Sequence, residues 1–144
     1  MSRGNAEVEC YNSSADFWDD RVFEVGEVYY IKDKLISMPN TDRLDTRNYH
    51  KGRPVVIMQN NSENSNPKSP LITIAPTSSN LKYKRENDLI LTPEKDGVKK
   101  KCFLITKLMQ PVLKVDLERS IGQLSNEKIK QSLSLVLEKL GVID

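Results

Sequence analysis

Basic and aromatic residues gather in and beside one polar segment, residues 33–52, and their types suit contact with phosphates and bases. The basic side chains there belong to Arg43, Arg47, Lys51 and Arg53. Cations of this kind neutralise phosphates, and Tyr49 and the more distant Tyr83 can stack on unpaired bases. These residues are therefore candidates for binding a single-stranded nucleic acid. The alternative interpretation is a solvated basic surface with tyrosines that pack against the protein.

The only histidine, His50, stands three residues before Arg53. Histidine exchanges a proton near neutral pH, so His50 is either an acid or base in the chemistry or an exposed loop residue with no role. One histidine and two distant cysteines, Cys10 and Cys102, make neither a metal-ligand cluster nor a disulfide framework. We therefore expect no cofactor and no metal, unless the substrate brings one.

Composition and motifs exclude several functional classes. The chain has 144 residues, of which 38% are apolar and 29% charged, and this describes one domain of ordinary size. No apolar run approaches the roughly 20 residues of a membrane span, and the first residues lack the pattern of a secretory signal. The phosphate-binding, dinucleotide-binding and serine-hydrolase motifs are absent. We expect a cytoplasmic protein with no membrane association.

Charge divides the chain into an acidic start and a basic remainder. Residues 1–28 have a net charge of −5, and residues 29–144 a net charge of +7. The basic remainder is either an ordinary solvated surface or a face that binds a polyanion. Because the start is also rich in Asn and Ser, we predict a partly flexible acidic N-terminal extension over residues 1–24 and one folded domain over residues 25–144.

Short apolar and β-branched runs between turn-forming residues predict five strands. The alternation in GEVYYIK and the apolar run in RPVVIMQ are the clearest of these. The predicted strands cover residues 26–32, 53–59, 71–75, 88–92 and 102–109. Pro76 and Pro93 are expected to end the third and fourth strands, and Pro111 to limit how far the fifth continues. The polar stretch between the first two strands is long enough to be either a functional or a disordered loop.

The period of the apolar residues changes near the C-terminal end. One apolar stripe at helical spacing consists of Ile129, Leu133, Val136, Leu137 and Leu140. Ser125 and Asn126 are candidate N-caps for this helix, and Gly141 is expected to end it. We expect the stripe to pack in the core.

A further helical turn is expected around residues 115–120, because Leu117 and Ile121 fit the same register and would both face inward. Five or six short strands followed by a terminal helix predict a mainly-β fold. The pattern favours a small barrel or sandwich with helical decoration.

Four segments, taken together, resemble the MazF/PemK family of toxins. They are GEVY at residues 26–29, GRPVVIMQN at 52–60, IAPTS at 74–78 and IGQLS at 121–125, followed by a helix that ends in Leu140-Gly141. They occur in the family's order from about residue 26 to residue 142, which is most of the chain. Each segment alone is weakly specific, whereas the set with its order is much more so.

The resemblance implies a small SH3-like barrel of the CcdB/MazF/PemK type with a C-terminal α-helix. It implies a homodimer that cuts single-stranded RNA at particular sequences without a metal and is held inactive by a cognate antitoxin protein. The family's active-site arginine, just before the proline that opens the second strand, falls on Arg53. Its active-site threonine falls on Thr77, with Ser78 beside it as an accessory candidate.

These residue types suit metal-free RNA cleavage. The neighbouring 2′-OH attacks the phosphorus, so negative charge builds on the non-bridging oxygens and a proton must leave one oxygen and reach another. A guanidinium offers fixed donors to those oxygens and stays charged, which makes Arg53 the expected electrostatic stabiliser. The hydroxyl of Thr77 can bind a phosphate oxygen or orient Arg53 but is a poor base. The general base is left open, with His50 as one candidate.

Two departures from the family pattern bear on catalysis. Many relatives have an Arg-Thr-Ile-Asp-like stretch at the end of the fifth strand, where this chain has Gln110-Pro111-Val112-Leu113. A second arginine and an acid are therefore missing, and Gln110 is the accessory candidate in their place. The loop at residues 33–52 is also longer than usual, and a glutamate found there in some relatives has no clear counterpart.

These departures keep other functions open. A catalytically degenerate barrel would bind RNA without cutting it, or bind a protein target as the related toxin CcdB binds gyrase; a small structural adaptor would do neither. The acidic extension adds a separate hypothesis, since antitoxins of this family lay an acidic, aromatic-bearing segment on the basic groove. Residues 7–24 have that composition and would dock on their own barrel or a dimer mate, unless they form a flexible tail.

Overall fold

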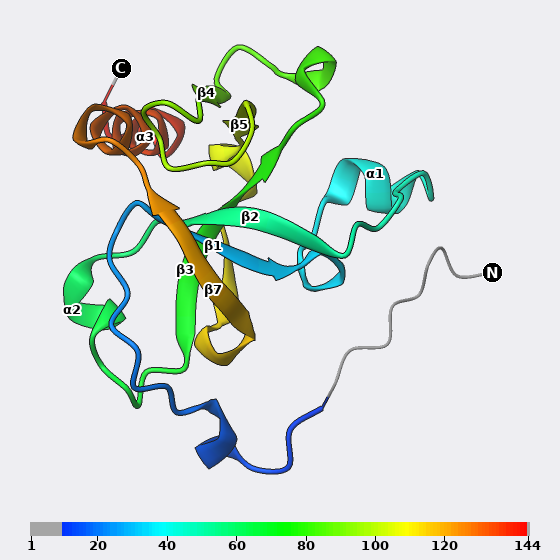
Figure 1. Ribbon diagram of the computed structural model, residues 1–144. Helices are drawn as coiled ribbons and strands as arrows, with labels where there is room; N and C mark the ends of the chain where they lie inside the picture. Colours follow the sequence, from blue (N-terminus) through cyan, green and yellow to red (C-terminus); the bar gives the residue numbers. More distant parts are fainter. Residues whose placement is uncertain (1–9, 144) are drawn as a thin grey trace.

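The computed structural model describes residues 10–143, which fold into a curled antiparallel sheet with a helix beside one end (Figure 1). The strands are β1 (Glu27–Lys32), β2 (Gly52–Ile57), β3 (Leu71–Ser78), β4 (Leu89–Leu91), β5 (Cys102–Leu104), β6 (Gln110–Leu113) and β7 (Leu117–Gln123). The α-helices are α1 (Pro39–Arg43), α2 (Asn61–Asn64) and α3 (Asn126–Lys139). Single 3₁₀ turns are η1 (Ser14–Phe17), η2 (Asp33–Leu35), η3 (Leu81–Tyr83), η4 (Thr106–Leu108) and η5 (Lys114–Asp116).

The strand order is β4-β5-β3-β2-β1-β7, and β6 also pairs with β3. β3 is the centre of this arrangement because it has two neighbours on one side: β6 pairs with its first half and β5 with Thr77 and Ser78 at its end. The long strand therefore belongs to two parts of the sheet, which curl around each other. The predicted mainly-β barrel with a C-terminal helix is confirmed.

The central strands bury side chains on both faces. Val55 and Ile57 of β2 pack into one apolar cluster with Ile31 of β1, whereas Val56, between them, packs into a second cluster with Val28. Successive side chains of a strand point to opposite faces, so an unbroken apolar run such as that of β2 requires cover on both sides. This is why the run at the start of the second predicted strand is continuous rather than alternating.

The third strand does not end at Pro76, as predicted, but continues to Ser78. Pro76 lacks an N–H and is poorly tolerated inside a sheet. Here it falls between the two neighbours on one side, since β6 pairs up to Ile74 and β5 begins at Thr77. The proline therefore removes no donor that this edge of the ladder needs.

The strand predicted over residues 102–109 ends early, because β5 stops at Leu104 and η4 follows; a separate strand, β6, begins at Gln110, just after the predicted segment. The turn moves the chain from the far half of β3 to its near half. Pro111 lies within β6, opposite Thr73, and β6 pairs only with β3 among the described strands. An edge position accommodates a proline, because one side of the strand needs no donor.

The helical turn predicted around residues 115–120 is confirmed only at its start, as the 3₁₀ turn η5, and is wrong from Leu117 on, where β7 begins and pairs with β1. The misleading signal was the spacing of Leu117 and Ile121. The register of β7 against β1 shifts twice, near Tyr29, and such bulges change which face a side chain reaches. Leu117 consequently packs in the first apolar cluster and Ile121 against the second.

The C-terminal helix α3 begins as predicted, with Ser125 as its N-cap accepting a hydrogen bond from the Lys128 N–H at 3.2 Å. Gly141 follows its end with a positive φ. The apolar stripe is only partly core: Ile129 packs against the second cluster, whereas Leu133, Leu137 and Leu140 are 39%, 40% and 67% exposed. The expectation that the whole stripe is buried is therefore wrong.

The end of the predicted acidic extension packs against the barrel. Phe23 is fully buried and its ring lies 5.2 Å from that of Tyr29. Arg21 donates hydrogen bonds to the carbonyls of Lys114 and Leu117 at 2.8 and 2.7 Å and is paired with Asp19. Residues 1–9 of the extension, and with them two of its acidic side chains, lie outside the described residues.

Candidate active site

Arg53 stands at the start of β2, where antiparallel pairing with β1 places it opposite Ile31. Its Nε donates to Asp33 Oδ1 at 2.6 Å, its Nη2 to Asp33 Oδ2 at 3.4 Å, and its Nη1 to the Thr77 carbonyl at 2.7 Å. A guanidinium has five N–H groups, so two are left for a substrate oxygen as far as residues 10–143 supply partners. The side chain is 11% exposed. It is thus held firmly while one side stays open.

Asp33, the first residue of η2, is the anchor of this arrangement and is fully buried. It also binds the guanidinium of Arg47 at 2.6 Å and accepts a hydrogen bond from the His50 backbone N–H at 2.9 Å. Burial alone would raise the pKa of Asp33, but these donors, the Arg53 guanidinium foremost, outweigh it and hold the pKa below its usual range. Asp33 is therefore a permanent anion at neutral pH.

Thr77 lies on β3, the strand that pairs with β2, and is 2% exposed. Its hydroxyl donates to the Pro54 carbonyl of β2 at 2.8 Å, and its own carbonyl accepts from Arg53. Thr77 therefore ties β3 to β2 beside Arg53, and its contact with Arg53 is through the backbone. Ser78 is less buried, and its Oγ accepts a weak hydrogen bond from Asn80 at 3.4 Å. Burial raises the pKa of the neighbouring Cys102 thiol to about 11, so Cys102 is protonated there.

A cleft of about 370 Å³ brings most of these groups together. It is lined by Tyr30, His50, Gly52, Arg53, Pro54, Thr77, Ser78, Ser79, Asn80, Val98, Lys99, Lys100, Cys102 and Ile121. Four predicted site residues, Arg53, Thr77, Ser78 and His50, therefore share one cavity although they come from separate segments. An exposed imidazole, a hydroxyl and a fixed guanidinium are the groups that phosphoryl transfer through a 2′-OH requires.

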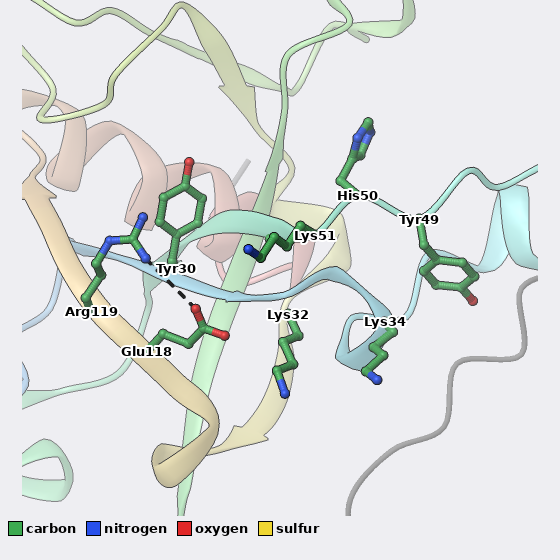
Figure 2. Close-up of a pocket in the computed structure, with 9 residues that line it drawn as sticks. Tyr30, Lys32, Lys34, Tyr49, His50, Lys51, Glu118 and Arg119 are labelled. Carbon is green, nitrogen blue, oxygen red and sulfur yellow. Dashed lines mark ion pairs between the residues drawn. The ribbon is translucent and has the colours of Figure 1, made fainter.

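A second cavity, of about 660 Å³, adjoins the cleft and is called the basic recess here. It is lined by Tyr30, Lys32, Lys34, Tyr49, His50, Lys51, Gly52, Glu118 and Arg119. Figure 2 shows Arg119 beside the Tyr30 ring, and Lys32 and Lys34 pointing the same way from the end of β1 and the following turn. Cations outnumber the single carboxylate, which belongs to Glu118 and lies 4.0 Å from Arg119. The recess is therefore suited to a polyanion.

Only some of the predicted RNA-binding residues line a cavity. Tyr49 and Lys51 line the basic recess, whereas Arg43 and Tyr83 line neither cavity. Arg47 has a side chain only 3% exposed and is bound to Asp33 and Asp42, so it supports the site from behind instead of offering its charge to RNA. Its guanidinium also covers the Tyr49 ring at 4.5 Å and so positions that residue.

Gln110 lies outside the cleft. Its Oε1 accepts from the Ser37 N–H at 2.8 Å, and its Nε2 donates to the carbonyls of Ser37 and Leu108. These three bonds pin the segment after β1 to the start of β6. The side chain is thus occupied by a structural role in this conformation.

Sequence reasoning missed Asp33, Tyr30, Lys32 and Arg119. Asp33 follows the first strand directly, and a carboxylate at the end of a strand beside a basic loop is a signal that marks it in retrospect. Arg119 is hidden because it meets Tyr30 only through the pairing of β7 with β1. Among residues 10–143 no three His, Cys, Asp or Glu side chains are grouped to hold a metal ion. In the same range, neither α3 nor any other helix is long and apolar enough to span a membrane.

Comparisons with known proteins agree with this architecture. The model of the PemK-like, MazF-like toxins of type II toxin-antitoxin systems matches residues 35–140. An endoribonuclease in complex with its cognate antitoxin from Mycobacterial species is 12% identical, with a TM-score of 0.59 over 83% of this chain and 94% of that chain. MazF in a MazE-MazF complex from Deinococcus radiodurans is 11% identical, with a TM-score of 0.61 over 85% of this chain and 98% of that chain. A sequence search of curated proteins finds no match.

Proposed function

Because the chain belongs to the PemK-like, MazF-like toxins of type II toxin-antitoxin systems, we propose that it is an endoribonuclease that cuts single-stranded RNA without a protein-bound metal. The observation that carries this proposal is the cleft in which Arg53, fixed by Asp33 and by the Thr77 carbonyl, meets His50 and Ser78. The solved structures of this fold include endoribonucleases, in agreement with the proposed reaction.

The reaction proceeds through the RNA itself. The 2′-OH attacks the adjoining phosphorus and loses its proton to a base, while the bond from phosphorus to O5′ breaks and O5′ gains a proton. The products are a 2′,3′-cyclic phosphate and a 5′-hydroxyl. The free N–H groups of Arg53 bind the non-bridging oxygens as their charge grows, and Ser78 donates a further hydrogen bond. His50 lines the same cleft, and its imidazole is our candidate for the group that takes up or supplies these protons.

The test is cleavage of a long single-stranded RNA in excess EDTA, with the fragment ends mapped. Arg53→Ala is expected to lower the cleavage rate by about 10²–10³-fold, the usual loss for one donor to a developing oxyanion. Arg53→Lys keeps the charge but loses the fork and is expected to recover little. The matched control is Arg85→Ala, since Arg85 is exposed and lines neither cavity. Equal rates for Arg53→Ala and the parent would remove Arg53 from the mechanism.

The position of Gln110 favours one alternative. Gln110 begins the stretch where many relatives have an arginine and an acid, so this chain has no charge there. Its side chain is also occupied by three hydrogen bonds to backbone groups. A barrel of this kind would bind RNA without cutting it, or bind a protein target. The same experiment separates the alternatives: well-folded protein that binds RNA but yields no cleaved ends in EDTA supports the binding function.

We further propose a homodimer that a cognate antitoxin protein inhibits, acting in the cytoplasm where mRNA is present. Leu133 and Leu137 support a second copy as the cover for α3, because leucines this exposed form an apolar surface that proteins normally bury in contacts. Leu133→Glu with Leu137→Glu is expected to convert dimers to monomers in light scattering. A parent that is monomeric at micromolar concentration, or a variant that stays dimeric, would contradict this interface.

A further inference from the structure

The basic recess opens directly beside the cleft. Tyr30, His50 and Gly52 line both cavities, so a strand that enters the cleft passes Tyr30 on its way into the recess. The two cavities adjoin at the paired ends of β1 and β2, where Tyr30 pairs with Pro54 and Lys32 with Gly52. The recess is therefore an adjoining space into which the neighbouring nucleotides of a bound strand can continue.

Tyr30 is held as a platform at this junction. The Arg119 guanidinium covers its ring at 4.4 Å from the centroid. The ring also lies close to the β2 backbone at Gly52, since a Cβ placed there would meet the Tyr30 Cδ1 at 3.4 Å, an ordinary van der Waals contact. Aromatic rings stack on nucleic-acid bases of any sequence, and the Arg119 guanidinium, which lies over one face of the Tyr30 ring, adds a second flat, positively charged surface for a base.

The charge of the recess is suited to a phosphate backbone. Lys32 and Lys51 are exposed, and no carboxylate of residues 10–143 lies within ion-pair distance of either. The one carboxylate of the lining, from Glu118, is paired with Arg119. At about 660 Å³ the recess has the size of a site for a small ligand, about 300–1,000 Å³.

From this geometry we propose that the basic recess is a substrate subsite: it holds the nucleotides that adjoin the cleaved linkage, with one base on Tyr30 and two backbone phosphates on Lys32 and Lys51. The subsite rests on the proposed function for its RNA substrate. It assigns to Tyr30 and Lys32 contacts that the arginine site itself does not need. It also makes binding depend on RNA beyond the scissile phosphate.

The first experiment measures the binding of a mixed-sequence 2′-O-methyl RNA of about twelve nucleotides, which lacks the attacking hydroxyl, by fluorescence anisotropy at several salt concentrations. For Lys32→Gln with Lys51→Gln, the slope of log Kd against log salt is expected to fall by about 1.4, since each single-strand phosphate contact contributes about 0.7. The matched control removes two equal charges from α3, by Lys128→Gln with Lys130→Gln. A subsite elsewhere would give the two double variants the same slope.

The second experiment separates stacking from charge. Tyr30→Phe keeps the ring and is expected to bind the 2′-O-methyl RNA as the parent does, whereas Tyr30→Leu is expected to bind about tenfold more weakly. Thermal melts of both variants show that the loss is not one of folding. Equal affinity of the phenylalanine and leucine variants would overturn the stacking contact.

Competing outcomes are distinguishable. Polyglutamate of equal charge is the probe for an acidic polypeptide; if it binds as tightly as the RNA and is insensitive to Tyr30→Leu, the recess is a protein-binding surface and the proposal is overturned. If the parent binds the RNA with the expected Tyr30 and salt dependence but cleaves no RNA, the subsite stands and the nuclease function fails. If the parent cleaves RNA and the recess variants match the α3 control, the subsite fails alone.

Discussion

Replacing Asp33 by Asn tests whether one buried carboxylate organises the whole site. The carboxylate bridges two guanidinium groups at 2.6 Å each, and its partners Arg47 and Arg53 are only 3% and 11% exposed. Removing one partner of a buried ion pair typically costs 3–5 kcal/mol, because the remaining charge stays buried. Asn keeps one acceptor oxygen, and Arg47 keeps Asp42, so the lower end applies. We expect a loss of about 3 kcal/mol, which lowers the Tm by about 10 °C.

The stability difference between the parent and Asp33→Asn is expected to depend on pH. The pKa of Asp33 in the folded protein lies below its usual value because its donors outweigh burial. A lowered pKa stabilises the fold at every pH above the unfolded value of about 3.9, and this contribution disappears as pH falls through the lower, folded value. The difference in free energy of unfolding between parent and Asp33→Asn is therefore expected to be full at pH 7 and to shrink below about pH 4.

Urea unfolding at several pH values measures the stability difference, and cleavage assays measure the effect on the site. Because Asp33 binds Arg53 through two N–H groups, Asp33→Asn is also expected to lower kcat. The control is Asp42→Asn, which weakens the Asp42 contacts with Arg47 and with the Met38 N–H but leaves Arg53 and its carboxylate in place, and it is expected to cost about 1 kcal/mol. A stability loss for Asp33→Asn no larger than that of the control, or one independent of pH, would refute the role of Asp33.

Three further substitutions test the frame around the site. Gly122→Ala is expected to cost about 3 kcal/mol in urea unfolding, because the new Cβ would lie 2.0 Å from the Gly97 carbonyl oxygen. Gly141→Ala meets no atom but strains a backbone with φ of +79°, so it is the milder control and is expected to cost about 1 kcal/mol. Phe23→Ala is expected to cost about 3–5 kcal/mol as a cavity in the first apolar cluster, and a negligible loss would show that the segment before β1 is dispensable. Lys114→Met removes the donor that three carbonyls near α2 share, at 2.9, 3.4 and 2.9 Å, so faster hydrogen exchange there is the expected result and unchanged exchange the contrary one.

The parts of the fold that sequence could predict depend on signals within a few residues. The alternation in β1, the apolar run of β2 and the N-cap at Ser125 are local, and the structure confirms the elements that they predicted. The family and the mainly-β barrel follow in the same way from short motifs in the right order, and the family match over residues 35–140 confirms that assignment. The errors arose where pairing with a distant strand decides the local structure. β3 continues past Pro76 because its neighbours change there, and Leu117 and Ile121 lie in a strand because β7 pairs with β1, with bulges.

Distance along the sequence also separates the candidate residues that the sequence suggested from those that it missed. Arg53, Thr77 and His50 were found through a motif or a residue type, and their catalytic roles stay predictions. Asp33 binds Arg47 and Arg53, which are 14 and 20 residues away in sequence, so only the fold shows that they share one carboxylate. This shared carboxylate also explains why the roles of the basic residues in and beside residues 33–52 could not be inferred from composition. Arg47 is a structural support, whereas Arg53 faces the cleft.

The position of the cleft and the recess follows from how far the second apolar cluster extends. On β1, Val28 is buried in that cluster, whereas Tyr30 and Lys32, on the same face, continue beyond it. On β2, Val56 is buried and the face ends in Pro54 and Gly52. Two paired strands thus extend past their apolar cover, and the side chains there can be aromatic, basic or absent without loss of core packing. The recess therefore forms where the sheet needs no hydrophobic residues, and substitutions in the recess are expected to change RNA affinity more than stability.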